Sequence, residues 1–365
     1  MFLNQGLPQI SVTMGPPNGT LIFHYPEDLG PDAVIGIDTQ FLTAQGILKG
    51  IKLIPPGLHL FHFSRSISQG DCLRYGWWFF IEEGQVLSVD WSEEQSVFTI
   101  IPADNSVGEL YPLMIEYPET HALWNELTKF VDTEALEEYI PTPPEPISTA
   151  TPLLEENMVL AELLKKRQPT LKLESQEHKE LKYTILQEKQ QAPQKMGEEL
   201  TRSALDRSWQ FEQLFGHDKD LFLAELQLTL IHFVVLGNLC SCTQWSTLLY
   251  LILRCESFLR ANPLFTSDLL SLMSTQLTLI PTEYIDELLV SQIVDVSKCR
   301  LAIEYLADFV PQLPSLYAPW QKLKFVAQRK LSMEKVGSIF DKNNFEIYDL
   351  GQHDADDEDA PAIVY

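Results

Sequence analysis

Histidine and cysteine are the side chains of this 365-residue chain most suited to hold a metal ion, and their spacing argues against it. His59 and His62 lie three residues apart in a strand-like run, so their side chains point to opposite faces and make poor co-ligands. Cys240 and Cys242 resemble half of a zinc site, but no second pair follows at zinc-like spacing. We therefore expect no metal, a hydrogen-bonded structural role for His59, and packing roles for the cysteines.

Sequence motifs of the common enzyme classes are absent. No Gly-x-Ser-x-Gly nucleophile turn, Gly-x-x-x-x-Gly-Lys phosphate loop, Gly-x-Gly-x-x-Gly fingerprint or His-Glu-x-x-His zinc motif occurs. Asp38 and Arg74 have two interpretations, an interior ion pair or two solvated side chains. The sequence therefore predicts neither an enzyme nor a cofactor, and a hydrolase built on an unfamiliar carboxylate pair stays open as an alternative.

The charge balance is strongly acidic. The chain has 51 acidic and 26 basic residues, which gives a formal net charge of −25 at pH 7. Such a field repels phosphate backbones and favours basic protein partners, so we expect no direct nucleic-acid binding. The best local exception is Lys165-Lys166-Arg167, and this run is also typical of a solvated helix end, where cations complement the helix dipole.

The cysteine count and the apolar runs bear on the compartment. Five cysteines form an odd number in apolar surroundings, which is typical of reduced thiols in the cytosol or nucleus. No basic residue precedes an apolar core near Met1, so we expect no secretory signal. The apolar run 221–236 contains Glu225 and Gln227 and is shorter than the roughly 20 residues of a membrane span. We expect no membrane association.

The first 140 residues have the pattern of a β-rich domain. Runs of β-branched and aromatic residues predict strands at 21–25, 34–39, 58–63, 73–81, 85–91 and 97–101. Pro55 and Pro56 lack backbone donors and predict an ordered corner between strands. Gly84 predicts a hairpin turn between two of the runs, and apolar spacing predicts a helix over 119–131. We interpret this part as a β-sandwich or small barrel.

The rest of the chain has helical spacing after a proline-rich linker. Four prolines within 141–146 predict the domain boundary, and the polar stretch 168–195 predicts a mobile or draped segment in which 183–186 docks as an edge strand. Capping-box spacing at 241–244 predicts a helix from there to Asn262, and 221–236 predicts a central apolar helix. The predicted units are 1–140 (β-rich), 141–197 (linker, helix and polar segment), 198–340 (helical) and 341–365 (acidic tail).

Several short motifs occur in the β-rich part: Gly36-Ile37-Asp38, then Gly50-Ile51-Lys52 followed by Ile54-Pro55-Pro56-Gly57-Leu58-His59 and Phe63-Ser64, and then Arg74-Tyr75-Gly76-Trp77. Together these motifs resemble the AAR-type splicing factor family. The resemblance also extends over Tyr117-Pro118, the run 124–130, Glu225-Leu226-Gln227 and the acidic C-terminal end, and it covers most of 20–135, 200–310 and the extreme C-terminus. The motif residues, to which we assign a structural role, are Gly36, Asp38, Gly50, Ile54, Pro55, Pro56, Gly57, His59, Arg74 and Gly76.

The resemblance implies a multidomain α and β fold in which a β-sandwich-like domain precedes an all-α, VHS-like helical domain. It implies an assembly factor of the spliceosomal U5 small nuclear ribonucleoprotein (snRNP). The implied partner is the large U5 scaffold protein, bound through its RNase-H-like and Jab/MPN domains in competition with the Brr-type RNA helicase and RNA. A cytoplasmic monomer that enters the nucleus with the immature U5 particle is expected. The alternative is a peptide-binding adaptor with a VHS-like domain.

The C-terminal end combines an acidic run with a β-prone terminus. Residues 354–359 carry five carboxylates in six positions, and composition alone favours a solubilising tail. An extended terminus of this kind can also add to the sheet edge of a partner, and the resemblance favours that interpretation, with the tail between the two scaffold domains. The predicted partner-binding residues are Asp356, Asp357, Glu358, Asp359, Ala360, Pro361, Ala362, Ile363, Val364 and Tyr365.

Overall fold

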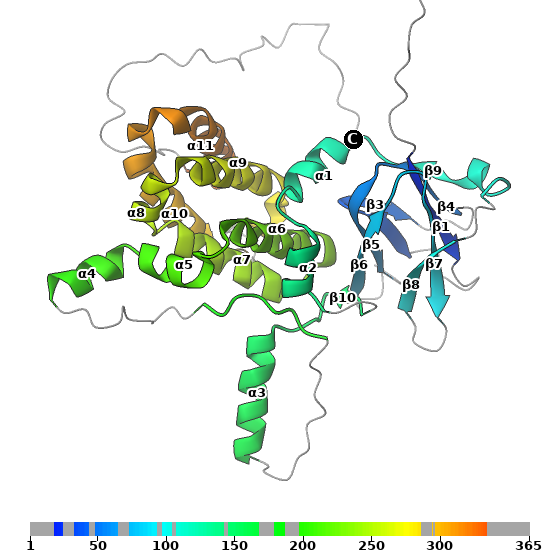
Figure 1. Cartoon of the computed structure of the whole chain (residues 1–365), viewed down its shortest axis with the longest axis horizontal. Helices are drawn as coiled ribbons and strands as arrows, with labels where there is room; N and C mark the ends of the chain where they lie inside the picture. Colours follow the sequence, from blue (N-terminus) through cyan, green and yellow to red (C-terminus); the bar gives the residue numbers. More distant parts are fainter. Residues whose placement is uncertain are drawn as a thin grey trace, which may run out of the picture.

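The computed structural model describes residues 18–24, 33–43, 48–64, 73–92, 97–103, 107–141, 145–167, 179–186, 197–285, 294 and 296–333. Within these residues two five-stranded sheets form the N-terminal part (Figure 1). The first has the order β8 (Val97–Pro102), β7 (Val86–Ser92), β1 (Gly19–His24), β4 (Gly50–Ile54) and β9 (Ile115–Glu116). The second has the order β10 (Ile147–Ser148), β6 (Arg74–Ile81), β5 (Gly57–Ser64), β2 (Val34–Ile37) and β3 (Gln40–Thr43). The six predicted strand regions are confirmed, whereas β3, β4, β9 and β10 were not predicted.

An aromatic core lies between the two sheets. Phe61 and Phe98 meet edge to face with ring centroids 5.6 Å apart, and Phe63 meets Phe98 at 4.8 Å. Trp77 packs on the same cluster, 5.7 Å from Phe61. Edge-to-face packing of this kind adds a geometric preference to simple burial, so it fixes how the sheets stack.

Two turns carry the chain from one sheet to the other. The Pro55-Pro56 corner joins β4 to β5, which confirms an ordered corner and places its strands in different sheets. The turn at Glu82–Gly84 joins β6 to β7 in the same way, so its prediction as a hairpin is wrong. Gly84 does adopt the expected positive φ of 68°. Local residue types specify a turn, but the sheet that receives the next strand is decided by tertiary packing.

Helices form most of the rest of the described chain. Their bounds are α1 His121–Leu127, α2 Thr133–Tyr139, α3 Leu154–Arg167, α4 Glu198–Leu205, α5 Ser208–Phe215, α6 Lys219–Leu236, α7 Leu239–Ile252, α8 Glu256–Ala261, α9 Pro263–Leu279, α10 Val296–Phe309 and α11 Tyr317–Lys330. Short 3₁₀ turns occur at Tyr111–Leu113, Thr282–Tyr284, Val310–Gln312 and Pro314–Leu316. No helix in these described residues has the length and apolar character needed to cross a membrane.

Helix α6 is the central element of the helical part, as predicted (Figure 1). Asp218 caps its N-terminus by accepting hydrogen bonds from the amides of Asp220 and Leu221, and Gly237 ends it in the left-handed conformation. Fourteen of its eighteen residues are buried, so neighbours cover it on every side. A helix that is apolar all round has no solvent face and must lie inside the fold.

Three expectations about helices are wrong. Helix α7 begins at Leu239, because Asn238 accepts the Ser241 amide at 2.8 Å and acts as the cap in place of Ser241. It ends at Ile252, and α8 follows as a separate helix. The predicted helix over 119–131 ends at Leu127, and α2 was not predicted. Helix boundaries depend on side-chain caps that several nearby polar residues can supply.

Sheet and helices share one core at their junction. Leu60 and Ile147 from the second sheet, Trp124 from α1, and Leu228 and Ile231 from α6 belong to a single buried cluster. Strand β10 lies after the prolines of the predicted linker, yet it pairs with β6, so the chain crosses the junction more than once. The two parts are therefore joined by a desolvated interface as well as by the linker between them.

Candidate functional site

The motif residues near the proline corner form a buried polar cluster. Asp38 has a positive φ of 57° and no solvent exposure. Its carboxylate accepts hydrogen bonds from His59 Nδ1 at 2.8 Å, from the Leu60 amide at 2.9 Å and from the Tyr117 hydroxyl at 2.5 Å. His59 Nε2 donates to the Pro55 carbonyl at 2.8 Å. Both ring nitrogens of His59 therefore face oxygen acceptors, the Asp38 carboxylate and the Pro55 carbonyl.

His59 is buried and hydrogen-bonded in this cluster, and Asp38 is neither solvated nor in an ion pair with Arg74, the two interpretations that the sequence left open. Asp38 pairs with His59 instead. Burial, followed by the Asp38 charge, raises the pKa of the Tyr117 hydroxyl well above its usual range, so Tyr117 remains a donor. All three side chains satisfy one another in the interior, and the cluster holds the corner without an open position for a substrate.

The other motif residues build the sheet and its contact with α6. Ile54 is fully buried between the sheets, Gly50 and Gly57 begin β4 and β5, and Pro56 lies in the corner. An added Cβ at Gly36 would lie 1.9 Å from the His62 ring, so this position has room only for glycine. Gly76 faces Leu236 of α6, where an added Cβ would lie 2.8 Å from a methyl carbon.

Hydrogen bonds tie β6 and β10 to the C-terminal end of α6. Arg74 Nη1 donates to the Val235 carbonyl at 3.1 Å, and Thr149 Oγ1 donates to the Leu236 carbonyl at 2.6 Å. Trp78 Nε1 donates to His232 Nε2 at 2.9 Å. Terminal carbonyls of a helix have no intrahelical partner, so these side chains satisfy groups that burial would otherwise leave unpaired. Arg74 is thus a junction residue.

Residues 179–186 cover α6 and α7 on another side. The amide and hydroxyl of Thr184 donate to the Glu225 carboxylate at 2.9 and 2.7 Å, and Gln244 Nε2 donates to the same carboxylate at 2.8 Å. Burial raises the pKa of Glu225. The Tyr183 hydroxyl lies 2.6 Å from His232 Nδ1. The segment therefore docks on helices, and the prediction that 183–186 is an edge strand is wrong.

Glu225 and Gln227, which interrupt the apolar run in the sequence, bind the segments that cover α6. Gln227 Oε1 accepts from the Phe130 amide, and its Nε2 donates to the Glu126 carbonyl, both at 2.9 Å. These buried polar side chains fix the register of neighbouring segments on an otherwise apolar helix. Sequence reasoning treated them as interruptions and as part of a family motif but did not predict their hydrogen bonds, although a polar pair inside such a run is itself a signal of specific partners.

The cysteines and the C-terminal tail complete the placement of the predicted residues. Cys242, Cys255 and Cys299 are buried free thiols, and burial raises the pKa of Cys242 to about 12, which agrees with packing roles. In the described residues no group of three or more histidine, cysteine or acidic side chains is arranged to hold a metal ion. The predicted partner-binding residues 356–365 lie outside the residues that the structure describes.

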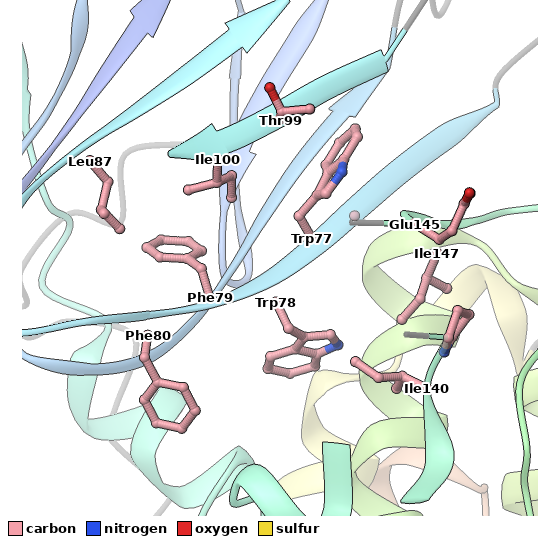
Figure 2. Close-up of a pocket in the computed structure, with 12 residues that line it drawn as sticks. Trp77, Trp78, Phe79, Phe80, Leu87, Thr99, Ile100, Ile140, Glu145 and Ile147 are labelled. Atoms are coloured by element: carbon pink, nitrogen blue, oxygen red, sulfur yellow. The ribbon is translucent and has the colours of Figure 1, made fainter. Parts of the chain in front are cut away.

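A pocket of about 250 Å³ opens where the two sheets part, between β6 and the strands β7 and β8 (Figure 2). Phe79 projects towards Ile100 on one side of β6, Phe80 and Trp78 project from its other side, and Ile140 and Ile147 complete the lining. Phe80 is 49% exposed, which is unusual for a phenylalanine beside a core. The lining is apolar apart from Glu145, Thr99 and the indole nitrogens, so the pocket is suited to binding and has no nucleophile and base pair for catalysis.

Sequence reasoning missed this pocket. The run Trp77-Trp78-Phe79-Phe80 has four adjacent aromatic residues, which exceeds what one buried face of a strand requires. That excess was the available signal. This run of aromatic residues could not reveal the pocket alone, because Glu145 comes from the proline-rich stretch and Ile147 directly follows that stretch.

Comparisons with known proteins agree with the motif-based resemblance. A family model described as the AAR2 N-terminal domain matches residues 17–141, and one described as the AAR2 C-terminal repeat region matches residues 183–334. The chain is also similar to the A1 cistron-splicing factor AAR2 of Saccharomyces cerevisiae. The two are 23% identical over 363 residues, which covers 91% of this chain and 95% of the yeast protein.

Proposed function

Because this chain belongs to the AAR2 family of splicing factors, we propose that it serves pre-mRNA splicing as an assembly factor of the U5 snRNP. On this proposal it binds the large U5 scaffold protein through the RNase-H-like and Jab/MPN domains. It bridges these domains and blocks premature binding of the Brr-type helicase and of RNA. It acts as a monomer without catalysis or cofactor, in the cytoplasm and then alongside the immature U5 particle as this enters the nucleus.

The observation that carries the proposal is the match of both halves of the chain to one family, over residues 17–141 and 183–334. Two physical features support it. The shared core keeps the sandwich and the helices in a fixed relation, which suits a protein that holds two partner domains at a set distance. The net charge of −25 favours binding to a basic surface on a partner protein. The bound chain would keep RNA off that surface, because it occupies the surface and its negative charge repels phosphate groups.

Calorimetric titration of a scaffold fragment that contains both domains tests the proposal. We expect the full chain to bind, and we expect a chain that ends at His353 to bind at least tenfold more weakly, a loss of about 1.4 kcal/mol. A chain that ends at Asp359 keeps the acidic run but lacks the β-prone terminus. Its affinity therefore separates the contribution of charge from that of strand addition. Unchanged affinity after removal of 354–365 contradicts the role of the tail, and no binding by the full chain contradicts the proposed function.

A further inference from the structure

Among the described residues, strand β6 has no backbone partner on one edge beyond the short strand β10. The Arg74 amide donates to Thr149 Oγ1 at 3.0 Å, and the Arg74 carbonyl accepts from the Thr149 amide at 2.9 Å. Backbone groups of an antiparallel strand alternate between its two neighbours, so those of Trp78 and Phe80 face the same edge as those of Arg74. In the described chain, β10 pairs with β6 only at Tyr75 and Gly76.

The opposite strand supports this assignment. Leu60 of β5 lies opposite Trp78, and its amide donates to Asp38 rather than across to β6. The Leu58 carbonyl, opposite Phe80, accepts from Trp124 Nε1 at 2.7 Å. Both positions are therefore non-hydrogen-bonded pairs with β5, and the amides and carbonyls of Trp78 and Phe80 find no backbone partner among the described residues. A free edge of this kind is a template for another strand.

The pocket beside this edge has the size and chemistry of a side-chain receptor. Its volume of about 250 Å³ lies below the roughly 300–1,000 Å³ typical of small-molecule sites, so it fits apolar side chains of a peptide better than a cofactor. Trp77 is only 7% exposed and lines the pocket, yet its Nε1 has no acceptor within the part of the chain that the structure describes. Buried donors normally find a partner, so this indole favours a ligand that brings an acceptor.

Acidic side chains lie at both ends of the free edge. Glu145 lines the pocket near β10, and the exposed Glu82 and Glu83 follow directly after the last residue of β6. Lys179 Nζ lies 3.5 Å from Glu145 Oε1, but both side chains are substantially exposed. An exposed ion pair contributes little energy, so a basic residue of a partner can replace Lys179. At about 3.4 Å per residue, basic residues four or five positions apart in an extended peptide would match the two acidic ends.

We propose that the β6 edge binds an extended segment of a partner protein as an added strand. The backbone of the segment pairs with Trp78 and Phe80. An apolar side chain enters the pocket beside Phe79 and Ile100, the next side chain of the segment packs against Phe80 on the other face of β6, and a polar side chain accepts from Trp77 Nε1. Lysine or arginine near each end of the segment meets Glu145 and Glu82. The site contains none of the predicted partner-binding residues of the tail, so its test is independent of the proposed U5 function.

Selection from a random nine-residue peptide library displayed on phage tests the proposal with the full chain as target. We expect enriched peptides to combine adjacent apolar residues, one for each face of β6, with basic residues four or five positions apart. Hydrogen exchange with the strongest synthetic peptide should then slow the amides of Trp78 and Phe80. No enrichment, enrichment of peptides without basic residues, or unchanged exchange at these two amides overturns the proposal.

Variants locate the binding. Phe80→Ala removes a half-exposed aromatic wall and should weaken the selected peptide about tenfold, as truncation of an aromatic anchor does. The matched control is Phe325→Ala on α11, where the side chain is 58% exposed and distant from the pocket lining, and it should leave affinity unchanged. Glu145→Gln should weaken the peptide less and reduce the salt dependence of its binding. Equal effects of Phe80→Ala and Phe325→Ala contradict the site.

Discussion

Lowering the pH from 7.5 to 5.0 should weaken the fold through His232. This residue joins three elements, because Trp78 of β6 donates to Nε2, the Tyr183 hydroxyl of the 179–186 segment meets Nδ1, and the ring itself belongs to α6. Burial lowers the pKa of His232 from 6.5 to about 3. The ring therefore stays neutral in the folded chain at pH 5.0, whereas the unfolded chain protonates it.

The magnitude follows from proton linkage. Because the pKa is lowered on folding, the stabilisation is complete above pH 6.5 and is lost as the pH falls towards 3. At pH 5.0 the unfolded histidine is about 1.5 pH units below its own pKa, which reduces the free energy of unfolding by about 2 kcal/mol. Burial also lowers the pKa of His62 to about 3. Protonation of His62 in the unfolded chain therefore also lowers the free energy of unfolding as the pH falls.

A variant comparison isolates His232. His232→Gln keeps an acceptor for Trp78 and a polar contact for Tyr183 but does not titrate. Urea unfolding followed by tryptophan fluorescence at the two pH values should show that the unmodified chain loses about 2 kcal/mol more than His232→Gln. The exposed His217→Gln serves as the control and should behave like the unmodified chain. Equal losses in the unmodified chain and His232→Gln would refute the reasoning.

Two further predictions concern stability. Asn238→Ala should lower the free energy of unfolding by about 2–4 kcal/mol, because it removes the α7 cap and two hydrogen bonds that Asn238 donates to carbonyls at 3.0 and 2.9 Å. The control Asn125→Ala, at an exposed site, should change the free energy of unfolding by less than about 0.5 kcal/mol. Equal effects of the two substitutions would contradict the role of the cap. The double change Pro55→Ala, Pro56→Ala should reduce the melting temperature more than scaffold affinity, and loss of binding in a fully folded variant would place function at the corner.

Local residue chemistry predicted the strands and the central helix because these depend on short-range patterns. The runs from β5 to β8 carry β-branched and aromatic residues between turn formers, and α6 is apolar over more turns than a strand can supply. His59 was predicted to be structural because it adjoins the proline corner. Short-range patterns do not show which strand or helix each element packs against. For this reason the Gly84 turn was assigned to a hairpin.

The wrong predictions share a physical cause. The structures that they concern depend on contacts between residues that are far apart in the sequence. Asn238 caps α7 and also donates to the carbonyls of Ser148 in β10 and of Thr151, about 90 positions earlier. The segment 183–186 has the composition of a strand, but the carboxylate of Glu225 and the amide of Gln244 satisfy its backbone on the helices. Strand propensity describes a half-buried surface rather than a pairing partner, so it could not distinguish these outcomes.

The position of the motif residues bears on how the proposed function would work. Asp38, Pro55 and His59 fix the corner between the sheets, while Arg74 and Gly76 fix β6 against α6. A hinge at this junction would have to expose the buried cluster around Trp124 and Leu228 and break the bond from Trp78 to His232. That cost disfavours independent movement of the two parts. A partner that contacts both would therefore meet a preformed surface and lose little conformational entropy of this chain on binding.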